Sequence, residues 1–304
     1  MTFTVKILGS GSASPLKERH HSAQLVTINQ ASYLIDCGEG TQYRLIEERV
    51  NLNKIQAIFI SHLHGDHYLG FVGLISTMGL LGRKNPLKVY APAGLLEIVT
   101  AHFYISKTVL EYEMQLFELK GDEKYFVYED ENVNVSAFPL VHGVVAYGFR
   151  LDEKPGQRKL LKEKIEGLLV QEMVLLKQGQ DVMDENGTVK YAFEEYTHPP
   201  TKCYSYAYCS DTMYSEKVIE AVKRVDVLYH ETTYLEEHKD KAIRNNHATA
   251  KEAGIVATKA LVEKLFIGHL SSRYEDFEAH LAETRIEFAN THAAIEGKTF
   301  TVNS

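Results

Sequence analysis

The stretch from Ser61 to His67, SHLHGDH, places three histidines and one aspartate within seven residues. It directly follows the apolar run IQAIFI at residues 55–60, which has the length and composition of a buried strand. Imidazole nitrogens and carboxylate oxygens at this density suit zinc as a ligand set, with Mn²⁺ or iron as possible alternatives. The stretch therefore predicts a metal site where a strand of an α/β fold ends.

The spacing within the stretch predicts two positions for metal ions. In an extended segment, residues two apart point to the same side, so His62 and His64 can bind one ion together. Asp66 and His67 lie beyond Gly65, where the chain can turn toward a second position.

Three other apolar segments also end in residues that bind metals. His142 directly follows SAFPLV, Asp211 directly follows YAYCS, and His269 directly follows LFIG. We expect all of these side chains to converge on one edge of a layered sheet. A single HxH pair would be typical of surface histidines or of adventitious metal binding. Ligands at the ends of four strands instead favour a dedicated metal site. The lack of a cysteine ligand argues against a purely structural zinc site.

Composition and charge limit the class of protein. The chain has 304 residues, enough for one large domain or two ordinary ones, with 44% hydrophobic and 24% charged residues and a net charge of -8. The acidic sign counts mildly against a nucleic-acid binder, although local clusters matter more than the sum. The three cysteines have no CxxC spacing, which fits a reducing cytoplasm. No secretion signal or apolar stretch of about 18 residues is found, so we expect no membrane span.

Hydrophobic patterning predicts an α/β chain with one interruption. Strands are expected within residues 3–11, 22–29, 31–40, 55–61, 87–92, 125–130, 133–143, 146–152, 204–212, 225–233 and 264–274. Helices are expected within residues 41–50, 68–83, 94–104, 215–224, 248–260 and 274–290. Residues 152–200 are rich in Lys, Glu and Gln and break the strand rhythm.

The SHLHGDH stretch resembles the signature of the metallo-β-lactamase superfamily, whose four-layer αββα fold packs two sheets between outer helices. Narrower features resemble the tRNase Z family of zinc endoribonucleases. They are ILGSGSASPLKERHHSA, YLIDCGEGTQYRL, VHGVVAYGFR, YCSDT, LYHETTY, NHATAKEAG and GHLSSRY, in the family's order. The resemblance covers nearly the whole chain and implies one metallo-β-lactamase domain over residues 1–304, with an inserted exosite-like arm at about 152–200.

The resemblance also implies two Zn²⁺ ions per subunit. One ion would lie on His62, His64 and His142, the second on Asp66, His67 and His269, with Asp211 bridging both. This division agrees with the spacing argument.

The implied reaction is removal of 3′ trailers from tRNA precursors. A hydroxide held by the metals attacks a phosphodiester and leaves a tRNA 3′-hydroxyl. His247 is the candidate proton donor, kept protonated by Glu231, although it could instead cap the helix that starts near Thr249. Asp66 is a candidate proton acceptor as well as a ligand. Asp36 could accept a hydrogen bond from a ligating imidazole, while His230 is expected only to pack.

Two further groups of residues are candidates for substrate binding. Ser271 and Arg273 follow His269, and the guanidinium could bind a phosphate or pair with a carboxylate. In the family, the arm grips the tRNA elbow. Here residues 154–164 hold five basic side chains and one acid, a net charge of +4, which favours phosphate binding but also fits a solvated helix face. These basic residues are Lys154, Arg158, Lys159, Lys162 and Lys164.

The arm departs from the family's pattern. The usual Gly-Pro-rich turn is absent before LKQGQDV, so we expect a differently shaped arm. The resemblance further implies a homodimer, with the apolar run at residues 71–82 as a contact helix or, equally, as buried core. Two other functions remain open: a small-molecule phosphodiesterase, lactonase or arylsulfatase of the same superfamily, and an RNA-holding relative that no longer catalyses.

Overall fold

A computed structural model of the chain describes residues 2–17, 19–199 and 201–303. The chain divides into two compact units. The main unit comprises Met1–Asp152 and Tyr204–Ser304, and the inserted unit comprises Glu153–Cys203. Each unit is described by itself below.

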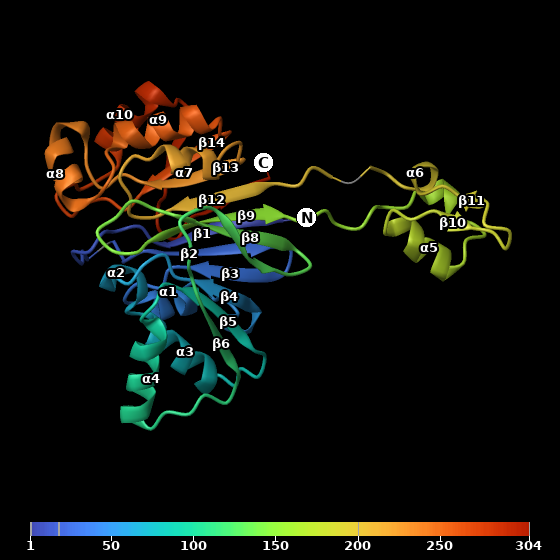
Figure 1. The fold of residues 1–304 in the computed structure, drawn as a ribbon, viewed down its shortest axis with the longest axis horizontal. Helices are drawn as coiled ribbons and strands as arrows, with labels where there is room; N and C mark the ends of the chain where they lie inside the picture. The colour runs from blue at the N-terminus through green and yellow to red at the C-terminus, as the bar shows by residue number, and fades with distance from the viewer. Residues whose placement is uncertain (1, 18, 200, 304) are drawn as a thin grey trace. The chain divides into compact units, whose positions relative to one another are not determined.

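The main unit is built on two seven-stranded sheets (Figure 1). The first sheet has the strand order β16 (Thr299–Thr301), β1 (Phe3–Gly9), β2 (Ala23–Ile28), β3 (Ala31–Ile35), β4 (Ile55–Phe59), β5 (Leu87–Ala91) and β6 (Met114–Glu118). The second has the order β15 (Thr291–Ala293), β14 (Lys264–Gly268), β13 (Val227–Glu231), β12 (Ser205–Cys209), β9 (Tyr147–Glu153), β8 (Val133–Pro139) and β7 (Tyr125–Glu129).

Helices cover the outer faces of both sheets. The first sheet carries α1 (Thr41–Glu47), α2 (Gly65–Tyr68), α3 (Phe71–Leu80) and α4 (Leu95–Ser106). The second carries α7 (Glu216–Ala221), α8 (Lys239–Asn245), α9 (Ala250–Ala260) and α10 (Glu278–Glu287). The four-layer αββα order expected from the sequence is therefore observed.

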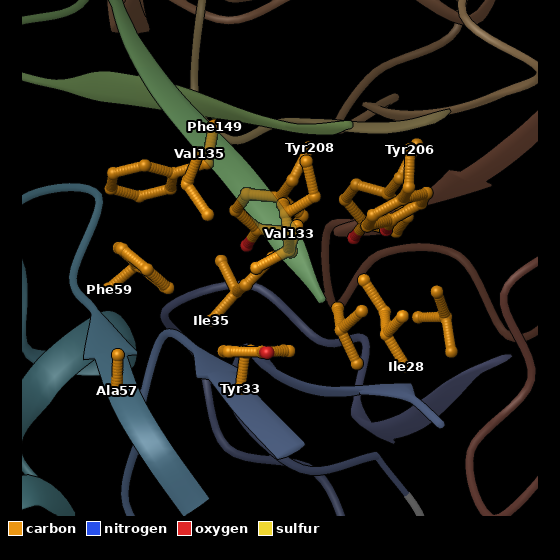
Figure 2. Close-up of a cluster of buried hydrophobic side chains, with 14 of the residues drawn as sticks. Ile28, Tyr33, Ile35, Ala57, Phe59, Val133, Val135, Phe149, Tyr206 and Tyr208 are labelled. Carbon is orange, nitrogen blue, oxygen red and sulfur yellow. The ribbon is translucent and has the colours of Figure 1, made fainter. Parts of the chain in front are cut away.

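The alternation of side chains along each strand creates separate cores. In β4, Ala57 and Phe59 pack into the core between the two sheets, whereas Ile58 packs into the core beneath α1, α3 and α4. Figure 2 shows the core between the sheets, where Phe59 lies close to Phe149 of the second sheet; their ring centroids are 5.3 Å apart. Both faces of a central strand are therefore buried, which explains the continuous apolar run at residues 55–60.

Parallel pairing decides where the polar strand ends meet. Strands β3 to β6 run parallel to one another in the first sheet, as do β12 to β15 in the second. The carboxyl ends of parallel strands lie on the same edge of their sheet, and this edge is where open α/β sheets commonly bind ligands. The segments after β3, β4, β12, β13 and β14 all carry the polar residues singled out in the sequence.

The inserted unit has a small core of its own. It contains α5 (Val170–Lys177), α6 (Phe193–Tyr196) and the paired strands β10 (Val182–Met183) and β11 (Val189–Tyr191). Leu168, Leu176 and Val182 are its buried apolar residues. That this unit is a tRNA-binding arm stays a prediction.

Sequence patterning missed β6, β15, β16, α2 and α8 of the main unit, and α2 is only four residues long. Strands β6, β15 and β16 are edge or near-edge strands, with short or partly exposed sequences that carry little alternation. Helix α8, KDKAIRN, buries only Ala242, so it has too few apolar positions for a helical period to be seen. Among the described residues, no helix is long and apolar enough to span a membrane.

The left-handed backbone of Arg224 gives a prediction about stability. Arg224 is exposed and has φ 56°, where a Cβ atom is strained. Arg224→Gly removes this strain and keeps the backbone hydrogen bond to Ala260, so the free energy of unfolding should rise by about 0.5–1 kcal/mol in denaturant titration. Arg224→Ala keeps the Cβ atom and should give no such gain. An equal gain in both variants would assign the effect to the arginine side chain.

Candidate metal centre

All seven of the metal ligands predicted from the sequence lie together in the main unit. They form two groups in which the ligand atoms are within 4.8 Å of one another. The first group is His62, His64, His142 and Asp211, and the second is Asp66, His67, Asp211 and His269. Asp211 belongs to both groups.

The second group has the dimensions of a tetrahedral zinc site. Ligand atoms at zinc distances of ~2.0–2.1 Å occupy tetrahedral corners ~3.3–3.4 Å apart. His67 Nε2 lies 3.3 Å from Asp66 Oδ2 and 3.4 Å from Asp211 Oδ1. His269 Nε2 lies 3.3 Å and 3.2 Å from the same two oxygens. The four atoms are therefore spaced to hold one small divalent cation.

The first group is somewhat wider and uses the other oxygen of Asp211. Oδ2 of Asp211 lies 3.6 Å from His62 Nε2 and 3.8 Å from His142 Nε2. His64 Nδ1 lies 3.1 Å from His142 Nε2. The two carboxylate oxygens of Asp211 thus face different groups, which is the geometry of a bridging ligand.

Buried atoms without hydrogen bonds support the same interpretation. Nε2 of His62, Nε2 of His67 and Oδ1 of Asp211 are buried and have no hydrogen-bond partner among the described residues. Buried polar atoms are normally satisfied, so three orphaned atoms at one place call for a shared ligand. The residues present fit two divalent cations.

Asp36 orients one of the candidate ligands. Its Oδ2 is 2.8 Å from Nδ1 of His67 and accepts hydrogen bonds from Tyr208 Oη at 2.7 Å and Ser61 Oγ at 2.9 Å, while Oδ1 accepts from Ser61 N at 2.7 Å. The carboxylate fixes the ring of His67 so that Nε2 faces the site. The sequence suggested this role for Asp36, but Tyr208 and Ser61 were missed because nothing local marks them.

The other candidate imidazoles are held in the same manner. His142 Nδ1 donates to the carbonyl of Asn246 at 2.8 Å, and His269 Nδ1 lies 2.9 Å from Thr233 Oγ1. Asn246 takes a left-handed conformation, φ 57°, at the end of α8. The ring orientation at the site therefore depends on backbone and hydroxyl groups far away in the sequence.

Electrostatics at the centre favour bound cations. Burial lowers the pKa of His62 well below its usual value, so its ring offers a lone pair at neutral pH. At His67, burial also lowers the pKa, but the charges of Asp211, Asp36 and Asp66 overcome it and raise the pKa well above normal. The negative charge of these carboxylates favours protonation of the His67 ring, and the same charge would attract a metal ion.

His247 and Glu231 form a buried pair beside the two groups. Glu231, at the end of β13, is fully buried, and its Oε1 lies 2.8 Å from His247 Nδ1. Burial lowers the pKa of His247, but the charges of Glu231 and Asp211 and the hydrogen bond to Glu231 outweigh it and raise the pKa to about 9. His247 Nε2 lies 4.0 Å from Asp211 Oδ2. Helix α9 is capped by Thr249, so His247 is not the capping residue.

Thr233 is a site residue that the sequence did not single out. Its hydroxyl lies 2.6 Å from Glu231 Oε2, 2.9 Å from His269 Nδ1 and 3.2 Å from His247 Nδ1. It therefore connects the candidate proton donor with a candidate metal ligand. The only feature of the sequence that pointed to Thr233 was its place in the stretch YHETTY, residues 229–234. His230 of the same stretch is buried and donates through Nδ1 to the Glu231 carbonyl.

A pocket of about 550 Å³ opens over the two groups. Ser271 and Arg273, the candidates for substrate binding, line it, and Arg273 Nε donates to Ser271 Oγ at 3.2 Å. The lining residues that were not predicted include Ser12, Ser14, Tyr234 and Asn245. Hydroxyl, amide and guanidinium groups thus surround the entrance to the centre.

The predicted arm residues belong to the inserted unit and are not uniformly free for substrate. Arg158 Nε donates to Thr197 Oγ1 at 2.6 Å, and its guanidinium carbon lies 4.8 Å from the centroid of the Phe193 ring. Lys159, Lys162 and Lys164 are exposed, and Lys154 is partly buried. Arg158 therefore has a structural use inside its own unit.

Comparison with known proteins first defines the class. Residues 3–154 match the model of the family described as Anti-Pycsar protein Apyc1. The structure resembles the metallo-β-lactamase fold protein YhfI of Bacillus subtilis, with TM-score 0.70 and 16% identity over 99% of this chain and 100% of that chain. It also resembles human tRNase Z, short form, with TM-score 0.73 and 24% identity over 98% of this chain and 99% of that chain. Fold and site together define an enzyme of the metallo-β-lactamase fold.

Full-length relatives then narrow the assignment. The chain is 46% identical over 304 residues to Ribonuclease Z of Cytophaga hutchinsonii, covering 100% of this chain and 97% of the relative. It is 36% identical over 304 residues to Ribonuclease Z of Bacteroides thetaiotaomicron, covering 99% of this chain and 96% of the relative. The chain belongs to the ribonuclease Z family.

Asp36 gives a prediction for metal binding. Asp36→Asn removes the charge that holds the ring of His67, so metal affinity should fall about 10–100-fold in chelator competition. Asp130→Asn is the matched control, because Asp130 also accepts four hydrogen bonds, two of them from Tyr33 and Tyr128. The control should lose stability and keep metal affinity. Unchanged affinity in Asp36→Asn would contradict the orienting role.

Proposed function

We propose that the protein is a zinc-dependent endoribonuclease that removes 3′ trailers from tRNA precursors. The relatives named Ribonuclease Z support the reaction class. The observation that carries the proposal is the pair of ligand groups that share the two oxygens of Asp211, because a shared carboxylate sets two cations close enough to act on one phosphodiester.

The residues fit two zinc ions, with Mn²⁺ or iron as chemically similar occupants. His62, His64 and His142 would hold one ion, Asp66, His67 and His269 the other, and Asp211 both. When bound, two such ions neutralise charge that develops on a phosphodiester and make water a nucleophile at neutral pH.

Chain residues supply the proton transfers in this proposal. His247, kept protonated by Glu231, donates a proton from Nε2 to the ribose 3′-oxygen of the tRNA, which is the leaving group when the P–O3′ bond breaks. Asp66 lines the pocket and is 6% exposed, so it can accept a proton from the attacking water and orient it. The tRNA then keeps its 3′-hydroxyl, and the trailer carries the 5′-phosphate.

Substrate binding is proposed at two places. At the pocket, the exposed Arg273 can bind a phosphate bidentately, supported by Ser271. In the inserted unit, the net charge of +4 at residues 154–164 contrasts with three basic and eight acidic side chains in the rest of Glu153–Cys203. This segregation would direct RNA to one part of the unit and away from the other.

A homodimer is proposed from exposed apolar side chains on two helices. Within the run at residues 71–82, Phe71, Leu74, Ile75 and Met78 are buried core, so only the end of the run can serve as a contact. Large apolar side chains are exposed at and after the ends of α3 and α4: Leu80, Leu81, Tyr104, Ile105 and Val109. Monomers rarely expose so much apolar surface, and a second copy would cover it.

A reducing cytoplasm suits the free thiols of the three cysteines.

Product mapping tests the function directly. Purified protein of known metal content is incubated with a 3′-extended tRNA precursor, and the new ends are determined. We expect a tRNA with a 3′-hydroxyl and a trailer with a 5′-phosphate. Turnover of bis(p-nitrophenyl) phosphate without any cleavage of the precursor would instead favour a small-molecule phosphodiesterase of the same superfamily.

The proposed proton donor can be separated from the metal ligands by the leaving group. His247→Ala should slow cleavage of the tRNA precursor by about 10²–10⁴-fold, because an alkoxide needs a proton. The same variant should hydrolyse bis(p-nitrophenyl) phosphate nearly as well as the wild type, because p-nitrophenolate leaves unprotonated. His64→Ala is the contrast and should lose both activities together with bound metal. A parallel loss of both activities in His247→Ala would remove it from the proton-donor role.

The basic stretch gives a prediction for salt dependence. Replacing the exposed Lys159, Lys162 and Lys164 by alanine should reduce the slope of log(kcat/KM) against log[salt] by roughly 0.7–0.9 per lysine for tRNA precursors. Lys177→Ala, in α5 of the same unit, should leave the slope nearly unchanged. Hydrolysis of bis(p-nitrophenyl) phosphate should be unaffected in both. An unaltered slope in the triple variant would mean that this stretch does not bind RNA.

A further inference from the structure

One carboxylate near the carboxyl end of the chain holds both ends of a loop near the amino end. Oε1 of Glu296 accepts hydrogen bonds from the backbone N–H groups of Ser10, at 3.0 Å, and His20, at 2.8 Å. Oε2 of Glu296 lies 2.8 Å from Nδ1 of His20. The side chain of Glu296 is only 12% exposed, so the carboxylate itself is largely shielded from water.

The loop between these two ends forms one wall of the pocket. Strand β1 ends just before Ser10, and the chain leaves the sheet until β2 begins. On this excursion, Ser12, Ala13 and Ser14 line the pocket over the metal groups, together with Asp66. The position of the loop therefore decides how wide the entrance to the centre is.

Apolar packing contributes little to holding this loop. Residues 13–17 are exposed, and the largest apolar side chain among them, Leu16, is 39% exposed. Among the described residues, its other hydrogen bonds include Gly11 N donating to His20 O at 2.8 Å and Ser12 N donating to Leu270 O at 3.4 Å. Arg19 Nη2 donates to the carbonyls of Tyr274, at 3.1 Å, and Glu275, at 2.8 Å.

A carboxylate is suited to this task because it accepts several hydrogen bonds at once. Bonds to a charged acceptor are about twice as strong as neutral ones. Removing the acceptor would leave the N–H of Ser10, a residue that is 2% exposed, without its partner. Among the described residues, the loop would then keep the hydrogen bonds of Gly11, Ser12 and Arg19.

We propose that Glu296 is a positioning residue that fixes the loop between Ser10 and His20 as the wall against which RNA lies beside the scissile bond. The role in RNA binding rests on the proposed function, whereas the hold on the loop does not. Glu296 contacts no candidate metal ligand in these hydrogen bonds, so its effect should fall on substrate binding.

The test combines amide exchange with kinetics in the full-length, metal-loaded protein. In Glu296→Ala, hydrogen–deuterium exchange should speed up at Gly11 and Ser12, whose acceptors are His20 O and Leu270 O rather than Glu296. KM for a tRNA precursor should rise on the order of tenfold with kcat nearly unchanged, because the wall binds substrate and transition state alike. Metal content and bis(p-nitrophenyl) phosphate turnover should stay at the wild-type level.

Further variants keep the test decisive. Glu296→Gln retains one oxygen but loses the charge and should give a smaller change in the same direction, which guards against misfolding of the alanine variant. His20→Ala removes only the ring contact and should be milder still. Lys298→Ala, an exposed side chain two residues away, is the matched control and should behave as the wild type.

The outcomes separate this proposal from the proposed function. Wild-type exchange at Gly11 and Ser12 in Glu296→Ala overturns the hold on the loop. A parallel loss of both activities and of metal overturns the positioning role and makes Glu296 a general support of the fold. If the wild-type protein does not cut the precursor, the proposed function fails, and amide exchange still decides whether Glu296 holds the loop.

Discussion

The carboxylate of Asp211 is the interaction on which the site depends. Its two oxygens face two separate groups of side chains, 3.2 Å from His269 Nε2 on one side and 3.6 Å from His62 Nε2 on the other. A carboxylate in this position, 3% exposed, is costly unless positive charge compensates it. The fold therefore brings this buried charge to the place where imidazoles and cations can share it.

A second layer of buried acceptors makes this arrangement specific. Asp36 and Glu231 are both fully buried, and each accepts hydrogen bonds from backbone and side-chain donors. Asp36 fixes His67, and Glu231 fixes His247, so each carboxylate sets the direction of one ring nitrogen. Because hydrogen bonds in a low-dielectric interior are strong and directional, these rings have little freedom to turn.

The pocket wall and the inserted unit differ from the metal groups in how much of their side-chain surface is buried. The pocket wall at residues 12–14 has no buried side chain, and the inserted unit has only the small core around Leu168, Leu176 and Val182. Such segments can change shape between relatives without disturbing the metal groups. The missing Gly-Pro-rich turn of the inserted unit is consistent with this freedom, as is the structural use of Arg158 within that unit.

Patterning in the sequence indicated an α/β chain and seven candidate ligands, which the structure brings together, and the resemblance to the metallo-β-lactamase superfamily implied the αββα layers. The α/β assignment and the ligands rested on local patterns: apolar runs of strand length, ligands at strand ends, and the HxHxDH spacing, each of which is confined to a few neighbouring residues. The tertiary structure decided that Thr233 connects His247 with His269, and that Glu296 reaches back across 276 residues to His20. It also showed that Thr249, not His247, caps α9. Such contacts depend on how distant segments pack, and no periodicity in the sequence encodes which hydroxyl or carboxylate will face which ring.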